Sequence, residues 1–232
     1  LAAKGAAVAV LDARVDAARA VAQSITAAGG VAIGIGCDVR DESAVVSAIA
    51  ESARALHGLD TLVCSAGITR PARTHQLSLT DWHAVLDVNL TGTFLAIREA
   101  IPHLIDAGAS AVVTIGSVAS IVAAGRTCAY DASKAGVLQL TRSIAVEYAD
   151  DGLRANCLCP GAVATDLVAN TRALLGPDNS DRTAGPSMTV KVPMGRVADP
   201  AEIAAVVAFL VSDDASFMTA AAVPVDGGYT AI

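Results

Sequence analysis

The chain has 232 residues and a formal net charge of -7, from 16 basic and 23 acidic side chains, with no extended basic run. This charge pattern argues against binding to nucleic acid, and the short, interrupted apolar runs argue against a membrane-spanning helix. The five cysteines are an odd number, which favours free thiols in a reducing compartment, so we expect a cytoplasmic protein.

Apolar runs alternate with helical patterns along the chain. The predicted strands occupy residues 7–11, 31–37, 59–64, 111–115, 154–159 and 222–225. The predicted helices occupy residues 15–28, 43–56, 80–103, 130–149 and 200–211, and residues 167–192 are predicted to be irregular. This alternation predicts an α/β fold, a three-layer, doubly wound parallel sheet with helices on both faces. No linker divides the chain, so residues 1–232 are predicted to form one domain.

Polar residues gather where the predicted strands end. In doubly wound sheets, ligands bind beyond the carboxyl ends of the strands, and these ends are followed by Asp12, Asp38, Ser65, Ser117 and Pro160. We interpret the 166–195 segment as a lid over the substrate, because it is long and lacks a regular pattern. Its apolar residues could cover an apolar substrate or could be ordinary packing residues: Leu167, Leu174, Leu175, Met188 and Val190.

Tyr130 and Lys134 stand four residues apart in a predicted helix, which places both side chains on one face. An ordinary tyrosine has a pKa of about 10, and a fixed ammonium group beside it favours the phenolate. Such pairs are common on solvated helices, so the spacing alone indicates little. Ser117, thirteen residues before Tyr130 at the end of a predicted strand, makes a proton-transfer site a stronger hypothesis.

With Asn89, Ser117, Tyr130 and Lys134 considered together, the chain resembles the short-chain dehydrogenase/reductase family over essentially its whole length. The matching motifs are Y-x-x-x-K with its preceding serine, P-G-A-V-A-T-D at 160–166, G-R-V-A-D-P-A-E-I-A at 195–204 and V-D-G-G at 225–228. The resemblance implies a Rossmann fold and an oxidoreductase that uses NAD or NADP. It implies no metal, and the cysteines and histidines show no metal-ligand spacing.

The resemblance also implies a role for each catalytic residue. Tyr130 would exchange a proton with the substrate oxygen, and Lys134 would lower the pKa of Tyr130 and hold the nicotinamide ribose. Ser117 would hydrogen-bond the carbonyl or alcohol group, and Asn89 would hold a water molecule that links Lys134 to solvent. The chemistry agrees, because hydride transfer to a carbonyl produces a developing oxyanion that needs hydrogen-bond donors.

Asp12 bears on the choice of cofactor. A carboxylate at this strand end can accept hydrogen bonds from the adenosine ribose and would repel a 2′-phosphate, which favours NAD over NADP; alternatively, Asp12 only begins a helix. The resemblance implies an adenine contact at Asp38 and Val39, and a carboxamide contact at Val163 and Thr165. The other implied cofactor contacts are Ala66, Gly67, Tyr130, Lys134, Pro160 and Gly161.

The family's phosphate-binding start, a first strand followed by T-G-x-x-x-G-x-G, is not present in this sequence. Gly30, Gly34 and Gly36 match the glycine spacing, but they lie within a predicted strand and do not open a helix. We therefore expect a sheet without its first, central strand, and a sequence that is a fragment lacking part of a ~30-residue unit. A molecule that begins at Leu1 is expected to bind the cofactor weakly or not at all.

The hypothesis with most support is the NAD-dependent interconversion of a secondary alcohol and a ketone. Two alternatives stay open: A-G-I-T-R at 66–70 resembles the 3-oxoacyl carrier-protein reductases, and the missing phosphate loop would suit a non-catalytic oligomeric binding protein. Arg70, Arg73 and Arg126 are dispersed, so we interpret each as a solvated surface residue. By resemblance, the protein forms a homodimer or homotetramer through its helices near 90–105 and 130–149 and its C-terminal helix and strand.

Overall fold

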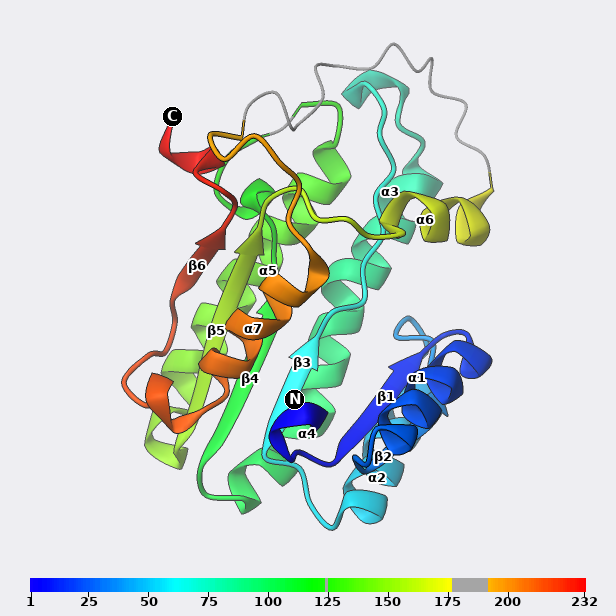
Figure 1. Cartoon of the computed structure of the whole chain (residues 1–232). Helices are drawn as coiled ribbons and strands as arrows, with labels where there is room; N and C mark the ends of the chain where they lie inside the picture. The colour runs from blue at the N-terminus through cyan, green and yellow to red at the C-terminus, as the bar shows by residue number, and fades with distance from the viewer. Residues whose placement is uncertain (124, 177–191) are drawn as a thin grey trace.

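The computed structural model describes residues 1–123, 125–176 and 192–232, and within these the strands form two parallel sheets (Figure 1). β1 (Val8–Asp12) pairs with β2 (Ala32–Gly36). The second sheet has the order β3-β4-β5-β6, with bounds Thr61–Cys64, Ser110–Ile115, Leu153–Pro160 and Ala222–Val225. Every pairing is parallel, which confirms the predicted doubly wound α/β fold.

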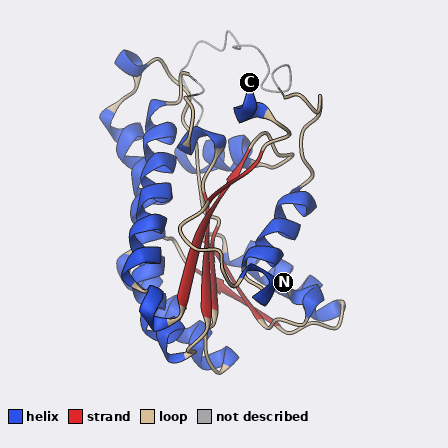
Figure 2. Ribbon diagram, turned by 90° about the vertical axis from the view of Figure 1, so that its left-hand side faces the viewer, coloured by secondary structure: helices blue, strands red, loops and turns tan. Residues whose placement is uncertain are grey.

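Helices cover both faces of these sheets (Figure 2). α2 (Glu42–Leu56), α4 (Gly92–Asp106) and α5 (Cys128–Glu147) lie on one face, while α1 (Val15–Ala27) and α7 (Pro200–Leu210) lie on the other. Two shorter helices, α3 (Leu79–Leu86) and α6 (Leu167–Leu175), stand near the carboxyl ends of the strands. No helix among the described residues is long and apolar enough to cross a membrane.

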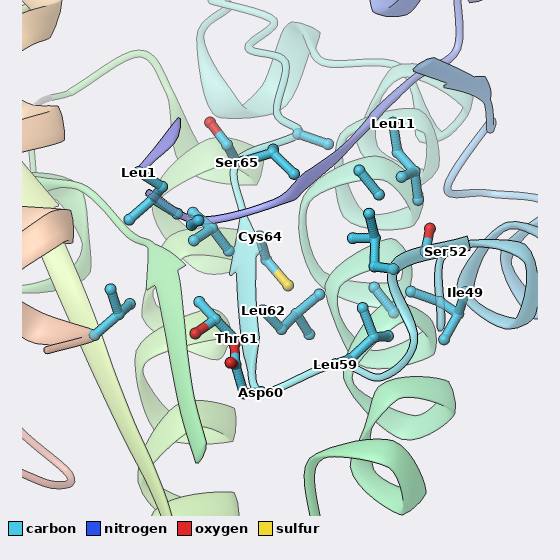
Figure 3. Close-up of a pocket in the computed structure, with 18 of the residues that line it drawn as sticks. Leu1, Leu11, Ile49, Ser52, Leu59, Asp60, Thr61, Leu62, Cys64 and Ser65 are labelled. Atoms are coloured by element: carbon cyan, nitrogen blue, oxygen red, sulfur yellow. The ribbon is translucent and has the colours of Figure 1, made fainter. Parts of the chain in front are cut away.

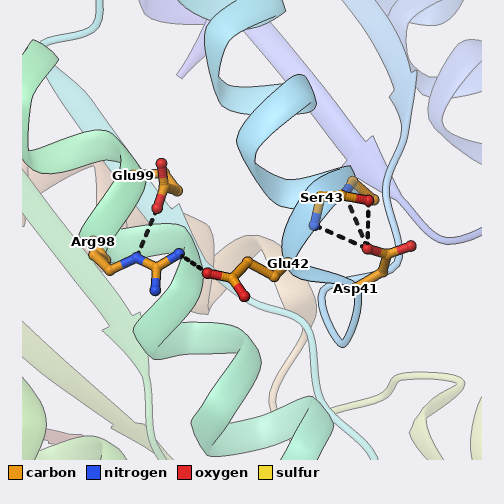
Figure 4. A network of polar contacts seen from close by, with 6 residues as sticks. Asp41, Glu42, Ser43, Arg98 and Glu99 are labelled. Atoms are coloured by element: carbon orange, nitrogen blue, oxygen red, sulfur yellow. Dashed lines mark hydrogen bonds and ion pairs between the residues drawn. The ribbon is translucent and has the colours of Figure 1, made fainter.

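The helix starts follow from local chemistry. Asp41 caps α2, because its Oδ1 accepts hydrogen bonds from the backbone N–H of Ser43 at 2.9 Å and of Ala44 at 3.2 Å (Figure 4). These bonds satisfy donors that a helix leaves free at its N-terminus. Asp199 caps α7 in the same way, and Pro200 occupies the first turn, where no backbone N–H is needed.

A cavity of about 410 Å³ separates the two sheets (Figure 3). Its walls are the facing edges of β1, with Val8 and Ala9, and of β3, with Thr61 and Leu62. As the sequence predicts, the described residues place no strand between β1 and β3. The glycines that match the phosphate motif have a packing role: a Cβ on Gly34 would lie 2.6 Å from the backbone of Ala18, so this glycine lets α1 pack against β2.

Three sequence predictions are wrong in detail. Residues 167–192 are not wholly irregular, because 167–175 form α6, a short helix with little buried surface; residues 177–191, with Met188 and Val190, lie outside the described residues. The predicted helix at 80–103 is two helices joined by a π-helical turn at Asp87–Thr91. Pro160 does not follow β5 but is its last residue, because it pairs with Val225 on β6.

Candidate active site

The four predicted catalytic residues come from three elements and meet at the carboxyl end of the second sheet. Ser117 follows β4, Tyr130 and Lys134 lie on α5, and Asn89 lies in the π-helical turn before α4. The Ser117 side chain lies close enough to Tyr130 for hydrogen bonding between them to act on the pKa of the tyrosine. Lys134 Nζ lies 5.7 Å from the centroid of the Tyr130 ring. The structure therefore brings the hydroxyl groups and the ammonium group into one cluster.

Lys134 is 4% exposed, and its Nζ donates a hydrogen bond to the carbonyl oxygen of Ile115 at 2.7 Å. Burial lowers the pKa of Lys134 to about 8, although the nearby thiols, with those of Cys157 and Cys159 the strongest, act to raise it. Both cysteines are free thiols, as predicted; they are fully buried, and their sulfur atoms lie 4.0 Å apart. The lysine therefore has a polarisable sulfur environment that the sequence did not indicate.

The electrostatics of Tyr130 differ from expectation. Burial raises its pKa; the hydrogen bond with Ser117 acts to lower it, and the charge of Asp131 acts to raise it. The pKa of Tyr130 is therefore not lowered overall, because desolvation of the phenolate dominates, and the expected effect of Lys134 on it stays a prediction. The carboxylate of Asp131 accepts a hydrogen bond from Thr127 Oγ1 at 2.9 Å, yet its charge still acts on Tyr130.

Ser117 is held by a small hydrogen-bond network that includes Ser120. Ser117 Oγ accepts a hydrogen bond from the backbone N–H of Ala119 at 3.1 Å, and the backbone N–H of Ser117 donates to Ser120 Oγ at 3.2 Å. Ser120 Oγ in turn donates to the backbone oxygen of Lys134 at 2.8 Å. Ser120 thereby joins the loop that carries Ser117 to the helix that carries Tyr130. Sequence reasoning missed Ser120, although the S-x-x-S spacing of a capping box was present.

Asn89 is completely buried, and its amide group hydrogen-bonds to other residues of the chain. Its Oδ1 accepts from the backbone N–H of Ile68 at 2.8 Å, and its Nδ2 donates to the Ile68 carbonyl and to Ser133 Oγ, both at 2.9 Å. Ser133 Oγ donates to the backbone oxygen of Tyr130 at 2.7 Å. Asn89 therefore connects the residues after β3 to the Tyr130 helix, and its predicted role in holding a water molecule stays a prediction.

The residues expected at the adenosine end lie at the carboxyl ends of β1 and β2. Asp12 is partly exposed and accepts a hydrogen bond from the backbone N–H of Arg14 at 2.8 Å. Asp38 forms an ion pair with Arg40 at 2.6 Å, and this bond lowers the pKa of the Asp38 carboxyl group. Val39 packs closely against α4, where Gly92 leaves room for it. These residues fit an adenosine group, with the condition that the adenine must compete with Arg40 for Asp38.

The residues expected at the nicotinamide end lie nearer the catalytic cluster. A Cβ on Gly67 would lie 3.5 Å from Lys134 Nζ and 3.6 Å from Asn89 Oδ1, so the backbone at Ala66-Gly67 passes directly beside the cluster. Backbone pairing holds three further predicted contacts in place. Pro160 pairs with Val225 in the sheet, and the Gly161 N–H donates to the Val225 carbonyl. Val163 forms an isolated parallel bridge with Ala198. Thr165 is exposed.

The donors in this cluster suit the ribose and nicotinamide of a dinucleotide. Among the described residues, however, no glycine-rich turn leads from a strand into a helix to hold a pyrophosphate. Within the same residues, no group of three or more His, Cys, Asp or Glu side chains is placed to bind a metal ion.

Comparison with known proteins identifies the family. A family model described as enoyl-(acyl carrier protein) reductase matches residues 1–230. A cis-4-hydroxycyclohexanecarboxylate dehydrogenase from Sinomonas cyclohexanicum is 40% identical over 233 residues, covering 100% of this chain and 90% of the relative. A solved short-chain type dehydrogenase/reductase from Mycobacterium marinum superimposes with a TM-score of 0.88 at 32% identity, covering 100% of this chain and 88% of that one. The chain belongs to the short-chain dehydrogenase/reductase family.

A third relative of this short-chain dehydrogenase/reductase is described by its name as inactive. It is an inactive 2-(S)-hydroxypropyl-CoM dehydrogenase from Xanthobacter autotrophicus, 42% identical over 205 residues, which cover 88% of this chain and 87% of the relative. Overall likeness to the family therefore does not establish turnover, and the arrangement of Ser117, Tyr130 and Lys134 must carry the functional argument.

Proposed function

We propose that this oxidoreductase interconverts a secondary alcohol and a ketone with NAD as the cofactor. The observation that carries the proposal is the cluster in which the Ser117 hydroxyl lies close enough to Tyr130 to affect its pKa and the buried Lys134 lies 5.7 Å from the tyrosine ring. The hydroxyl groups of Ser117 and Tyr130 can both donate a hydrogen bond to the same substrate oxygen. The shifted pKa values of the buried Lys134 and the half-buried Tyr130 support a functional site at this cluster.

The chemical roles follow from what each group can donate or accept. When bound, the nicotinamide supplies or removes the hydride. In ketone reduction, the Tyr130 hydroxyl gives its proton to the substrate oxygen and Ser117 donates a second hydrogen bond; in alcohol oxidation, the tyrosine oxygen takes the proton back. Burial raises the pKa of Tyr130, and the protonated hydroxyl group is the form that donates to the substrate oxygen in reduction. Lys134 supplies a donor for the ribose.

The preference for NAD rests on Asp12. Its carboxylate stands free enough at the end of β1 to meet ribose hydroxyl groups and would repel a 2′-phosphate. The guanidinium of Arg14, 3.6 Å from this carboxylate, is partly neutralised by it. Replacing Asp12 with Ala removes the repulsion and leaves Arg14 unpaired, so we expect the ratio of kcat/KM for NADP to that for NAD to rise by at least about 10-fold.

The relatives support a secondary alcohol as the substrate. The name of the Sinomonas relative describes a hydroxyl group on a cyclohexane ring that also carries a carboxylate, and we extend the secondary alcohol, without the carboxylate, to this chain. The 3-oxoacyl reductase alternative is supported by the description of the matching family model. In both cases we propose that the 166–195 segment, of which 166–176 and 192–195 are described, covers the substrate.

We also propose that the protein is a homodimer or homotetramer. Phe94 on α4 is 43% exposed and Val146 on α5 is 76% exposed, and Phe217 beside β6 is fully exposed. These side chains lie on the elements through which relatives are expected to pair, and their burial against a second copy would be favourable.

The test is a coupled assay of the full-length protein with NAD and a panel of secondary alcohols, in which wild type is compared with Tyr130→Phe and Tyr148→Phe. Tyr148 ends α5 outside the cluster, so its variant controls for loss of a hydroxyl group. We expect Tyr130→Phe to lose about 10²- to 10⁴-fold in kcat and Tyr148→Phe to retain its rate. Undiminished activity of Tyr130→Phe would refute the role of Tyr130, and no turnover by a folded wild type that binds NADH would favour the non-catalytic alternative.

A further inference from the structure

Arg70 is not the solvated surface residue that its position in the sequence indicated. Its side chain is 7% exposed and makes three directed hydrogen bonds. Nε donates to Asp81 Oδ1 at 3.0 Å, while the two terminal nitrogens donate to the backbone oxygens of Leu175 at 2.8 Å and Gly176 at 3.0 Å. A buried guanidinium group with this many fixed partners holds parts of the structure together, and its charge is not available to an anionic substrate.

The partners of Arg70 are the ends of two helices. Leu175 is the last residue of α6 and Gly176 caps it, so Arg70 binds carbonyl groups at the negative end of the helix dipole. Asp81 lies in the first turn of α3, the positive end of that helix, with its own N–H bonded to Ser78 Oγ at 3.0 Å. Arg70 therefore fastens the C-terminus of α6 to the N-terminus of α3, two segments that lie near each other in Figure 1.

The helix that Arg70 holds has few other attachments. Thr171 is the only residue of α6 that is fully buried, and Val168 and Leu174 are 49% and 42% exposed. A helix of nine residues is marginal by itself in water. The second attachment also comes from the same loop, because the backbone N–H of Thr69 donates to Thr171 Oγ1 at 3.1 Å. The position of α6 therefore depends on residues 69 and 70 more than on apolar packing.

The same loop is connected to the catalytic helix. Ile68, directly before Thr69, is bonded through both backbone groups to Asn89, and Asn89 is bonded through Ser133 to the backbone of Tyr130. On the other side, Leu175 packs against the apolar cluster of Ile68, Val85, Val88 and Ala129, against which Tyr130 also packs. Three consecutive residues thus fix α6 relative to the tyrosine.

We propose that Arg70 is a positioning residue that holds α6 beside Tyr130 and thereby sets the affinity of the site for its substrate. This inference rests on the proposed alcohol dehydrogenase function, since it assigns α6 to the wall of that site. Arg70 touches neither the proton-transfer groups nor Lys134, so its loss should change substrate binding more than the chemical step. Because the guanidinium group is paired with Asp81 and bonded to two backbone carbonyls, its charge is not free to bind an anionic substrate.

The experiment compares Arg70→Met, Arg70→Lys and the matched control Arg98→Met. Met keeps an apolar stem of similar reach but loses all three hydrogen bonds, and Lys keeps the charge but cannot reproduce the planar fork. Arg98 also forms two ion pairs, with Glu42 and Glu99 (Figure 4), but it is 39% exposed and lies on α4 away from α6. Hydrogen exchange by mass spectrometry is read on peptides from α6 and from β4 and β5, and kcat and KM are measured for the best alcohol of the panel.

For Arg70→Met we expect exchange in α6 to accelerate roughly 10- to 100-fold, as for the loss of hydrogen bonds to a charged group, with exchange in β4 and β5 unchanged. KM should rise at least about 10-fold while kcat stays within about 3-fold. Arg70→Lys should lie between wild type and Arg70→Met, and Arg98→Met should match wild type. Unchanged exchange in α6 would overturn the proposal, as would faster exchange with an unchanged KM. Hydrogen exchange is measured without substrate, so it tests the attachment of α6 even if the wild type turns over no alcohol, a result that would reject the proposed function alone. If Arg70→Met fails to fold, the same criteria are applied to Arg70→Lys.

Discussion

Replacing Asn89 with Ala should destabilise the protein and slow its reaction. The substitution removes an amide group that is 0% exposed and makes three hydrogen bonds, of 2.8, 2.9 and 2.9 Å. It leaves the N–H and C=O of Ile68 and the hydroxyl group of Ser133 without this partner. At about 1 kcal/mol for each bond, the loss is roughly 2–4 kcal/mol. For a chain of this size, that corresponds to a fall in Tm of roughly 5–15 °C.

Asn156→Ala is the matched control for this variant. Asn156 is 1% exposed, and its amide group also braces two segments: Nδ2 donates to the Met218 carbonyl at 2.8 Å and Oδ1 accepts from the Ala221 N–H at 3.1 Å. It lies in β5 and bonds to the segment that leads into β6, away from Tyr130. Both variants should therefore lose stability, but only Asn89→Ala disturbs the path through Ser133 to the tyrosine.

The assay combines urea denaturation with steady-state kinetics at a temperature where both variants are folded. We expect kcat/KM of Asn89→Ala to fall at least about 10-fold, because small misplacements of a catalytic group are costly, while that of Asn156→Ala stays within about 2-fold of wild type. Equal activity in the two variants would show that Asn89 only stabilises the fold. A loss of stability below about 1 kcal/mol for Asn89→Ala would contradict the hydrogen-bond accounting itself.

Two further predictions follow from buried polar groups. Ser120→Ala should reduce kcat roughly 10-fold, because it frees the Ser117 loop from α5. Ser110→Ala removes a buried hydroxyl group that has no partner in the described part of the chain, so it should leave the free energy of unfolding unchanged or raise it by up to about 1 kcal/mol. An unchanged kcat in Ser120→Ala, or a loss of stability in Ser110→Ala, would contradict these assignments. Burial lowers the pKa of Lys134 to about 8 in the folded protein, whereas an unfolded lysine has a pKa of about 10.4. Between these two pH values the unfolded chain binds more protons at this residue than the folded chain does. The contribution of Lys134 to the free energy of unfolding therefore rises with pH over this range, by up to about 3 kcal/mol. The stability difference between wild type and Lys134→Met, measured by denaturation from pH 7.5 to 9.5, should therefore move in favour of wild type, and a difference that does not vary with pH would show that the lysine is not desolvated.

Much of the fold was predictable because its signals are local. Strands buried on both faces read as continuous apolar runs, and the caps at Asp41 and Asp199 have side chains suited to free backbone N–H groups. The grouping of the proposed catalytic residues was predictable for a similar reason, because Tyr130 and Lys134 share a helix face and Ser117 follows a strand. The sheet without a strand between β1 and β3 followed from a motif whose residues were not in the sequence.

The parts that sequence reasoning missed depend on contacts between distant residues. Arg70 meets the carbonyl groups of Leu175 and Gly176 more than a hundred positions away, and no periodicity marks such a pairing. The pKa of Tyr130 was predicted from one neighbour, Lys134, whereas burial of the ring in the folded chain has the larger effect. The helix at 167–175 was missed because it has hardly any buried face, and the amphipathic pattern that reveals a helix is the trace of such a face.

The two halves of the proposed site depend on different parts of the fold. The residues of the proposed proton-transfer cluster follow a strand of the four-stranded sheet or lie on helical segments packed on it, whereas Asp12 and Asp38 lie at the carboxyl ends of β1 and β2 across the cavity. The halves are joined on one face by packing of α2 against α4, with Val45 and Ile49 in the same buried cluster as Leu95. The Arg98–Glu42 ion pair crosses the same boundary at 2.6 Å (Figure 4). Because it is solvent-exposed, it contributes no more than about 1 kcal/mol, so the apolar packing sets the distance between the cofactor's two ends. Substitutions in the α2–α4 interface should therefore weaken cofactor binding before they disturb the geometry of Tyr130 and Lys134.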